Sequence, residues 1–138
     1  MIYLPDTNAF SAHLASKSPA LSARLKAGQL AGELRLSVMA LAELEFGAEK
    51  ARVALGHTLY TRRVRDLSSV LTPVPLGASF TGHYARVRVH LVGRREKIGD
   101  RDTIIAAHAL ALGATLVTRN VAEFARVPGL KVENWQTD

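Results

Sequence analysis

Short apolar segments alternate with helical patterns along this chain, and that alternation restricts the possible folds more than any other feature. We expect extended segments at residues 2–4, 35–38, 70–76, 115–118 and 130–133. We expect helices at residues 19–30, 39–51, 53–69, 78–92 and 101–112, with Gly113 ending the last of them. Short apolar strands that alternate with helices form a parallel sheet, and the helices cover both of its faces. The sequence therefore predicts an α/β fold with a short parallel sheet of about four to five strands.

The chain shows no internal repeat, low-complexity tract or linker, and its length suits one domain over residues 1–138. It has no Cys, which excludes disulfides, zinc–thiolate sites, iron–sulfur clusters and thiol nucleophiles. The lack of Cys fits a reducing cytoplasm. No apolar run approaches the ~18 residues of a membrane span, and the N-terminal segment lacks the pattern of a signal peptide. We therefore expect a cytoplasmic protein with no membrane partner.

Basic residues are concentrated in the middle of the chain. The net charge is +6, but residues 50–101 hold eleven Lys and Arg against three acids, and the remainder carries a net charge of −2. Thirteen of the eighteen bases are Arg, whose guanidinium can bind phosphate through two hydrogen bonds. One interpretation is a surface that binds a polyanion, most simply a nucleic acid. The alternative is a solvated basic face that only keeps the protein in solution.

Four carboxylates lie near the ends of different predicted strands or on the helices beside them: Asp6, Glu43, Asp102 and Glu123. In parallel α/β sheets, ligands bind beyond the carboxyl ends of the strands. Each acid also has a simpler explanation. Asp6, Asp100 and Asp102 can cap or begin helices, and Glu123 can belong to an exposed loop with Asn120 in a turn.

Glu43 is the most informative of these acids. On the predicted helix it shares one face with Met39, Ala40, Phe46 and Gly47, and it is the only charged residue in that apolar stripe. A carboxylate on a buried face needs a partner, a metal ion or a raised pKa. The alternative is a Glu at the rim of the helix that pairs with an Arg.

Four converging carboxylates would repel one another unless a cation lay between them. Oxygen ligands suit Mg²⁺ or Mn²⁺, and the five His residues show no zinc-binding spacing such as HExxH. We expect His108 to be a packed or rim residue. The chain contains neither a P-loop nor a GxSxG motif, so nothing in it indicates an NTPase or a serine hydrolase.

Three segments together resemble the PIN-domain ribonucleases, specifically toxins of the VapC type from bacterial toxin–antitoxin pairs. They are LPDTN at residues 4–8, SVMALAELEFGAEK at residues 37–50 and IGDRDTIIAAHALALGATLVTRNVAEFARVPGLKVENW at residues 98–135. The similarity in order and spacing covers essentially the whole chain. The resemblance implies a PIN fold with an acidic pocket for Mg²⁺ or Mn²⁺. It also implies an endoribonuclease that hydrolyses RNA phosphodiester bonds.

The resemblance implies roles for individual residues. Asp6, Glu43 and Asp102 match the acids that would hold the metal ion, and Glu123 matches the fourth catalytic acid, which would assist a second ion or the attacking water. Polar residues that would support these acids are Thr7, Asn8, Thr118 and Asn120. Asp100 is an extra acid that we expect to cap its helix or to support the site indirectly. The arginines that would hold the RNA backbone are Arg86, Arg94, Arg95, Arg101 and Arg119.

Two residues depart from the family pattern within the matching segments, the extra acid Asp100 and Pro5. Pro5 stands at the last position of the first strand, where an apolar residue is usual. Because Pro has no N–H to donate, we expect strand pairing to end early there.

The resemblance also implies partners. They are RNA, with tRNA as one candidate, a VapB-like antitoxin, a second copy of the chain in a homodimer, and a toxin–antitoxin hetero-oligomer. Two alternatives remain open from the residues. A metal nuclease directed at DNA would use the same chemistry, and a phosphoacceptor signalling domain also places acids at strand ends. The second alternative needs a Lys at a strand end, whereas Arg119 follows residues 115–118.

Overall fold

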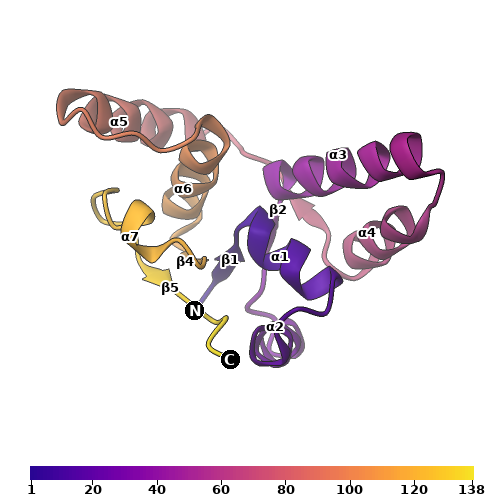
Figure 1. Ribbon diagram of the computed structural model, residues 1–138. Coiled ribbons are helices and arrows are strands. Elements are labelled where there is room, and N and C mark those ends of the chain that lie inside the picture. The colour runs from indigo at the N-terminus through magenta and orange to yellow at the C-terminus, as the bar shows by residue number, and fades with distance from the viewer.

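Seven helices and five short strands alternate along the chain in the computed structural model, which describes residues 1–138 (Figure 1). The strands are β1 (Tyr3–Pro5), β2 (Leu36–Ser37), β3 (Pro73–Val74), β4 (Thr115–Val117) and β5 (Val132–Glu133). The helices are α1 (Thr7–Leu14), α2 (Pro19–Leu30), α3 (Val38–Leu55), α4 (Leu59–Val70), α5 (Phe80–Gly93), α6 (Asp100–Leu112) and α7 (Val121–Phe124). The predicted α/β fold with parallel strands is confirmed.

The strands form two small parallel sheets joined at one point. β4 lies between β1 and β5 in a three-stranded sheet, and β2 pairs with β3 in a two-stranded one. An isolated bridge between Tyr3 and Leu34 connects the sheets, so the strand order across the molecule is β3-β2-β1-β4-β5. The chain runs outward from β1 in both directions, which makes the boundary between β1 and β4 the topological switch point. Open parallel sheets bind ligands at that point.

Pro5 accounts for the division into two sheets. Pairing between β1 and β4 continues through Pro5 opposite Val117, and the Asp6 N–H donates to the Val117 carbonyl at 2.9 Å. The expectation that pairing ends early was therefore wrong on this side. On the β2 side, Tyr3 exchanges hydrogen bonds with Glu33 and Arg35, at 2.8 and 2.9 Å. Alternate residues of a parallel strand bond to opposite neighbours, so the N–H that Pro5 lacks would have faced β2.

All five predicted helices are present, some with different bounds, and two short helices are added. α2 has the predicted bounds. The boundary predicted between residues 51 and 53 was wrong, because α3 continues to Leu55, Gly56 at φ 73° ends it, and α4 begins only at Leu59. α6 ends at Gly113, at φ 65°, as predicted. Two short helices were not predicted, α1 and the single turn α7. α1 matters most, because it begins directly after Asp6.

The two long helical pairs stand at opposite ends of the molecule. Figure 1 shows α3 beside α4 at one end and α5 beside α6 at the other, with the strands between them. The core between these layers contains fully buried side chains from both sheets and from the flanking helices: Leu4, Phe10, Leu36, Leu116 and Phe124. None of the helices has the length and apolar character needed to cross a membrane.

His108 connects α6 to the ends of β2 and β3. It is fully buried, as the packed alternative predicted, and its Nδ1 lies 2.8 Å from the Ser37 hydroxyl oxygen. Its Nε2 donates to the Pro75 carbonyl at 3.1 Å, which leaves Nδ1 to accept from Ser37 in the neutral ring. Burial lowers the pKa of His108, since the charged imidazolium is disfavoured there. His108 therefore serves packing in its neutral form.

Candidate active site

Asp6 occupies the switch point between β1 and β4. It follows β1 directly, is 3% exposed and caps α1, because its carboxylate accepts the Ala9 N–H at 2.8 Å. Burial raises the pKa of Asp6, while hydrogen bonds from the Thr118 hydroxyl and the Ala9 N–H oppose that rise. Thr118 follows β4, the strand beside β1, so two neighbouring strand ends place the acid and its donor together.

Asp102 shares a neighbourhood with two other acids. It lies in the first turn of α6 and is partly buried. Burial and, to a smaller extent, the charges of Glu123 and Asp6 together raise the pKa of Asp102 to about 6, while Arg101 opposes the rise. Asp6, which follows β1, and Glu123 of α7 therefore lie close enough to Asp102 of α6 for their charges to act on it. Three of the four predicted catalytic acids thus influence one another electrostatically.

Glu43 reaches the site from the rim of α3. The buried face of this helix carries Ala40, Leu41, Leu44 and Ala48. The prediction that Glu43 lies within a buried stripe was therefore wrong, because the stripe runs through the neighbouring positions. The alternative is correct: Glu43 pairs with an Arg. Its Oε1 lies 3.0 Å from Nε of Arg101, and the Glu43 side chain is 22% exposed.

A polar hollow of about 440 Å³ joins Glu43 to Asp102. No hydrophobic side chain lines it, and the lining residues are Thr7, Asn8, Glu43, Gly99, Asp100, Arg101 and Asp102. Asp100 does not cap α6, contrary to one of its two expected roles. The helix starts one residue earlier than predicted, so Gly99 is the cap residue and Asp100 is the first helical residue. Asp100 is exposed at the mouth of the hollow.

A second hollow, of about 430 Å³, shares Asn8 with the first and contains Asp6. Its lining residues are Asp6, Asn8, Ser11, Ala12, Lys17, Thr118, Arg119, Asn120 and Gln136. The Thr118 hydroxyl oxygen accepts the Asn120 N–H at 3.0 Å, which holds the two predicted supporting residues together. Lys17 and Gln136 were not predicted. Lys17 follows α1, which the sequence did not predict, and Gln136 comes from the C-terminal segment after β5.

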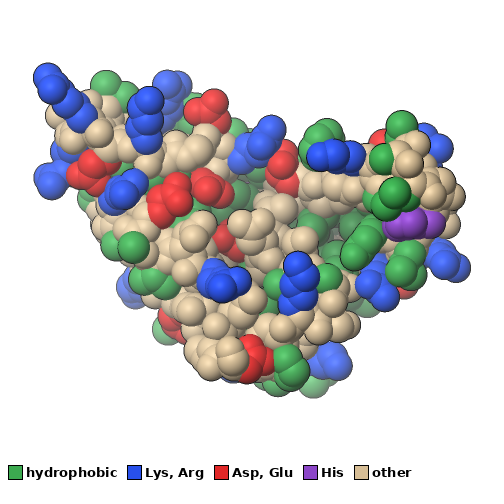
Figure 2. Space-filling view, in the orientation of Figure 1, with side chains coloured by type: hydrophobic (Ala, Val, Ile, Leu, Met, Phe, Trp, Pro, Cys, Tyr) green, Lys and Arg blue, Asp and Glu red, His purple; other side chains and the backbone are tan.

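The five predicted arginines divide into two groups. Arg101 and Arg119 line the two hollows. The other three, Arg86, Arg94 and Arg95, lie on α5 or just after it and line neither hollow. Figure 2 shows acidic side chains near the middle of one face, between α6, α7 and the start of α3, with Lys and Arg side chains on either side.

The carboxylate oxygens of the site are suitable ligands for a hard divalent cation, but they are not arranged around a single position. The acids of the site offer only oxygen ligands, as Mg²⁺ and Mn²⁺ prefer. The repulsion that raises the pKa of Asp102 is what a bound cation would relieve. However, no three acidic or His side chains are placed to hold one ion between them. The pair between Glu43 and Arg101 gives a physical reason, since the guanidinium already neutralises that carboxylate.

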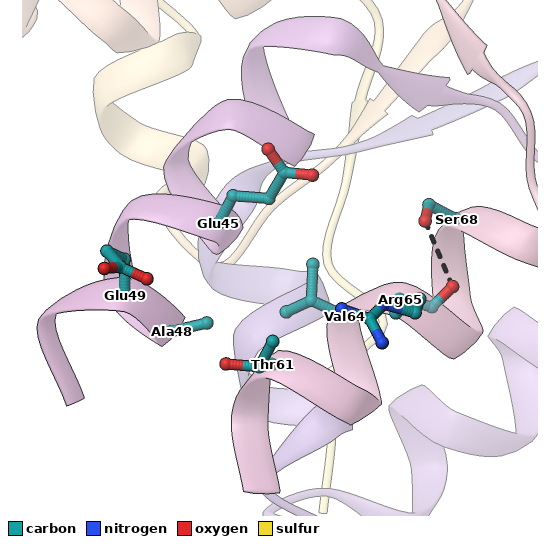
Figure 3. Close-up of a pocket in the computed structure, with 7 residues that line it drawn as sticks. All are labelled: Glu45, Ala48, Glu49, Thr61, Val64, Arg65 and Ser68. Carbon is teal, nitrogen blue, oxygen red and sulfur yellow. Dashed lines mark hydrogen bonds between the residues drawn. The ribbon is translucent and has the colours of Figure 1, made fainter. Parts of the chain in front are cut away.

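A third hollow, of about 370 Å³, lies between α3 and α4 and contains none of the predicted site residues. Figure 3 shows Glu45 and Glu49 on α3 facing Thr61 and Arg65 on α4. It is therefore separate from the candidate active site.

Comparisons with known proteins agree over nearly the whole chain. Residues 3–130 match the family described as PIN domain. Ribonuclease VapC2 of Rickettsia felis is 34% identical over 139 residues, which cover 98% of this chain and 98% of that protein. The tRNA(fMet)-specific endonuclease VapC of Shigella flexneri is 29% identical over 133 residues, covering 96% and 97%. A solved structure of VapBC2 from Rickettsia felis, bound to a DNA fragment from their promoter, matches with a TM-score of 0.87 and 31% identity, covering 98% and 99%.

Proposed function

Because the chain belongs to the PIN-domain family, we propose that it is a metal-dependent endoribonuclease toxin, neutralised by a VapB-like antitoxin. The observation that carries the proposal is the position of Asp6 at the switch point of the sheet, together with the charges of Asp6 and Glu123 that raise the pKa of Asp102. The relatives named as ribonucleases support RNA as the substrate. PIN-domain ribonucleases generally depend on divalent metal ions, and an oxygen-only donor set favours Mg²⁺ or Mn²⁺.

In this mechanism, Asp6, Glu43 and Asp102 would hold the ion, which requires Glu43 to leave Arg101 and the carboxylates to lie closer together than they do in this structure. When bound, a divalent cation neutralises clustered carboxylates, lowers the pKa of water and stabilises charge on a leaving oxygen. Glu123 would orient the attacking water and accept its proton. Thr118 and the start of α1 hold the Asp6 carboxylate in place, since both donate hydrogen bonds to it. Arg101 and Arg119 would bind the phosphates, and the products would carry a 5′-phosphate and a 3′-hydroxyl.

The partners follow from the relatives. The solved structure that resembles this chain is a VapBC complex, and we propose a corresponding hetero-oligomer with an antitoxin, and a homodimer of this chain. The name of the Shigella flexneri relative makes tRNA one candidate substrate. Sequencing of RNA 5′ ends after induction in cells would identify the target. Co-expression with the adjacent upstream reading frame would test neutralisation, and growth arrest that the upstream frame does not relieve would contradict it.

Cleavage of purified RNA tests the enzyme directly. We expect cleavage with Mg²⁺, loss of cleavage with EDTA, and at least a hundredfold loss in Asp6→Asn and Asp102→Asn, in line with the removal of a catalytic acid. Asp66→Asn is the matched control, because Asp66 is an exposed acid on α4 that lines neither of the two hollows beside the acids. Thermal unfolding confirms that each variant folds. Full activity in either site variant, or activity that survives EDTA, would contradict the proposal.

The substrate class needs its own comparison, because carboxylates and a metal ion act equally on DNA. Digestion of matched RNA and DNA strands side by side distinguishes them. Preferential cleavage of DNA would favour the alternative of a DNA-directed nuclease.

A further inference from the structure

The two polar hollows beside the acids form a path along α1. One contains Glu43, Arg101 and Asp102, the other contains Asp6, and both are lined by Asn8. We propose that a single RNA strand crosses the acids along this path, and that Lys17 and Arg119 bind its phosphates in the Asp6 hollow. This inference rests on the proposed function, and it assigns a phosphate-binding role to Lys17 and places the phosphate that Arg119 binds in the Asp6 hollow.

Lys17 and Arg119 are the cations of the Asp6 hollow, and both are exposed. Neither forms an ion pair or a side-chain hydrogen bond within the chain. Arg101 differs, because it is paired with Glu43. Asp6 forms no ion pair with either of them; the residue is 3% exposed, and its carboxylate accepts the Ala9 N–H. Two unpaired cations beside buried acids are thus free to bind phosphate, as charged groups at nucleic-acid interfaces do.

The lining of this hollow favours contacts to the strand backbone over contacts to base faces. Apart from Ala12, every lining side chain is polar or charged, and none is aromatic. Base stacking on a protein is strongest on aromatic rings, and the single guanidinium here, that of Arg119, is the group that we assign to phosphate. Ser11, Asn120 and Gln136 offer hydrogen-bonding groups to phosphate or ribose instead. We therefore expect binding here to depend on salt and to be insensitive to base identity.

Equilibrium binding of a short fluorescent single-stranded RNA over a series of salt concentrations tests the inference. The measurements use the Asp102→Asn background, which prevents cleavage and leaves the lining of the Asp6 hollow intact. Lys17→Ala and Arg119→Ala should each weaken binding and each reduce the slope of log Kd against log salt by about 0.7, the value for one lost phosphate contact on a single strand. The slope of the double variant should fall by the sum of the two single changes, and Arg119→Lys should keep the slope of its parent.

Lys26→Ala is the matched control, because Lys26 is an exposed Lys on α2 that lines neither hollow. Lys17→Gln and Arg119→Gln replace the Ala variants if these fail to fold in thermal unfolding. If the wild type binds and cleaves RNA but the double variant leaves the slope of log Kd against log salt unchanged, the inference is overturned and the proposed function stands. The alternative occupant of the Asp6 hollow would then be another partner, such as an acidic peptide. A parent protein that neither binds nor cleaves RNA overturns both.

Discussion

Replacement of Asp102 by Asn should stabilise the metal-free protein at neutral pH. Burial, Glu123 and Asp6 raise the pKa of Asp102 from 3.8 to about 6. The fold therefore favours the protonated acid. The stabilisation by the protonated form of Asp102 is fully present below the unfolded-state pKa, and it is lost as the pH rises through about 6. At neutral pH the ionised carboxylate opposes folding, and Asn removes that charge at nearly constant size.

The magnitude follows from the size of the shift. A difference of about two pKa units corresponds to roughly 3 kcal/mol, at about 1.36 kcal/mol per unit. Asp102 is only partly buried, so solvent screens its interaction with the neighbouring acids. We therefore expect Asp102→Asn to raise the free energy of unfolding by about 1–2 kcal/mol, a large change for a domain with about 5–15 kcal/mol in total.

Urea unfolding in EDTA, followed by circular dichroism, measures this change. At about pH 7.5 the variant should unfold at higher urea than the wild type, and near pH 3.5 the two should almost coincide, because Asp102 is then largely protonated in both states. Asp66→Asn should alter neither comparison. Equal midpoints near pH 7.5, or a stabilisation that persists near pH 3.5, would refute the reasoning. Added Mg²⁺ should stabilise the wild type and not the variant, since a ligand raises stability by binding the folded state.

Three further predictions concern Arg101, His108 and Leu116. Arg101→Ala releases Glu43 from its ion pair, so Mg²⁺ should raise the melting temperature of this variant more than that of the wild type; an equal shift would show that the pair does not compete with the ion. The lowered pKa of His108 means that the unfolded chain binds more protons below about pH 6.5. Stability should therefore fall as the pH drops through that region, and His108→Gln should weaken the dependence in urea unfolding. Leu116 is fully buried in β4, and Leu116→Ala should cost about 2–5 kcal/mol in the same assay; a loss below about 1 kcal/mol would contradict its place in the core.

Local signals predicted most elements because their causes are local. Ser18 accepts the Leu21 N–H and Pro19 occupies the first turn, so α2 begins where the sequence indicates. The two missed helices, α1 and α7, are eight and four residues long. Helices this short have weak periodic patterns, and tertiary packing stabilises them more than intrinsic propensity does.

The sequence alone determined the chemistry available to this protein: acids near strand ends, no thiols, and an excess of Arg. It also placed Asp6 directly after the first strand, since a strand end is a local property. Only the tertiary structure brought Asp102 and Glu123 to Asp6, paired Glu43 with Arg101, and set Lys17 beside the site. These contacts depend on β1 lying beside β4, although more than a hundred residues separate the two strands in the chain. The order of strands is set by the packing of the whole core, and no local pattern contains it.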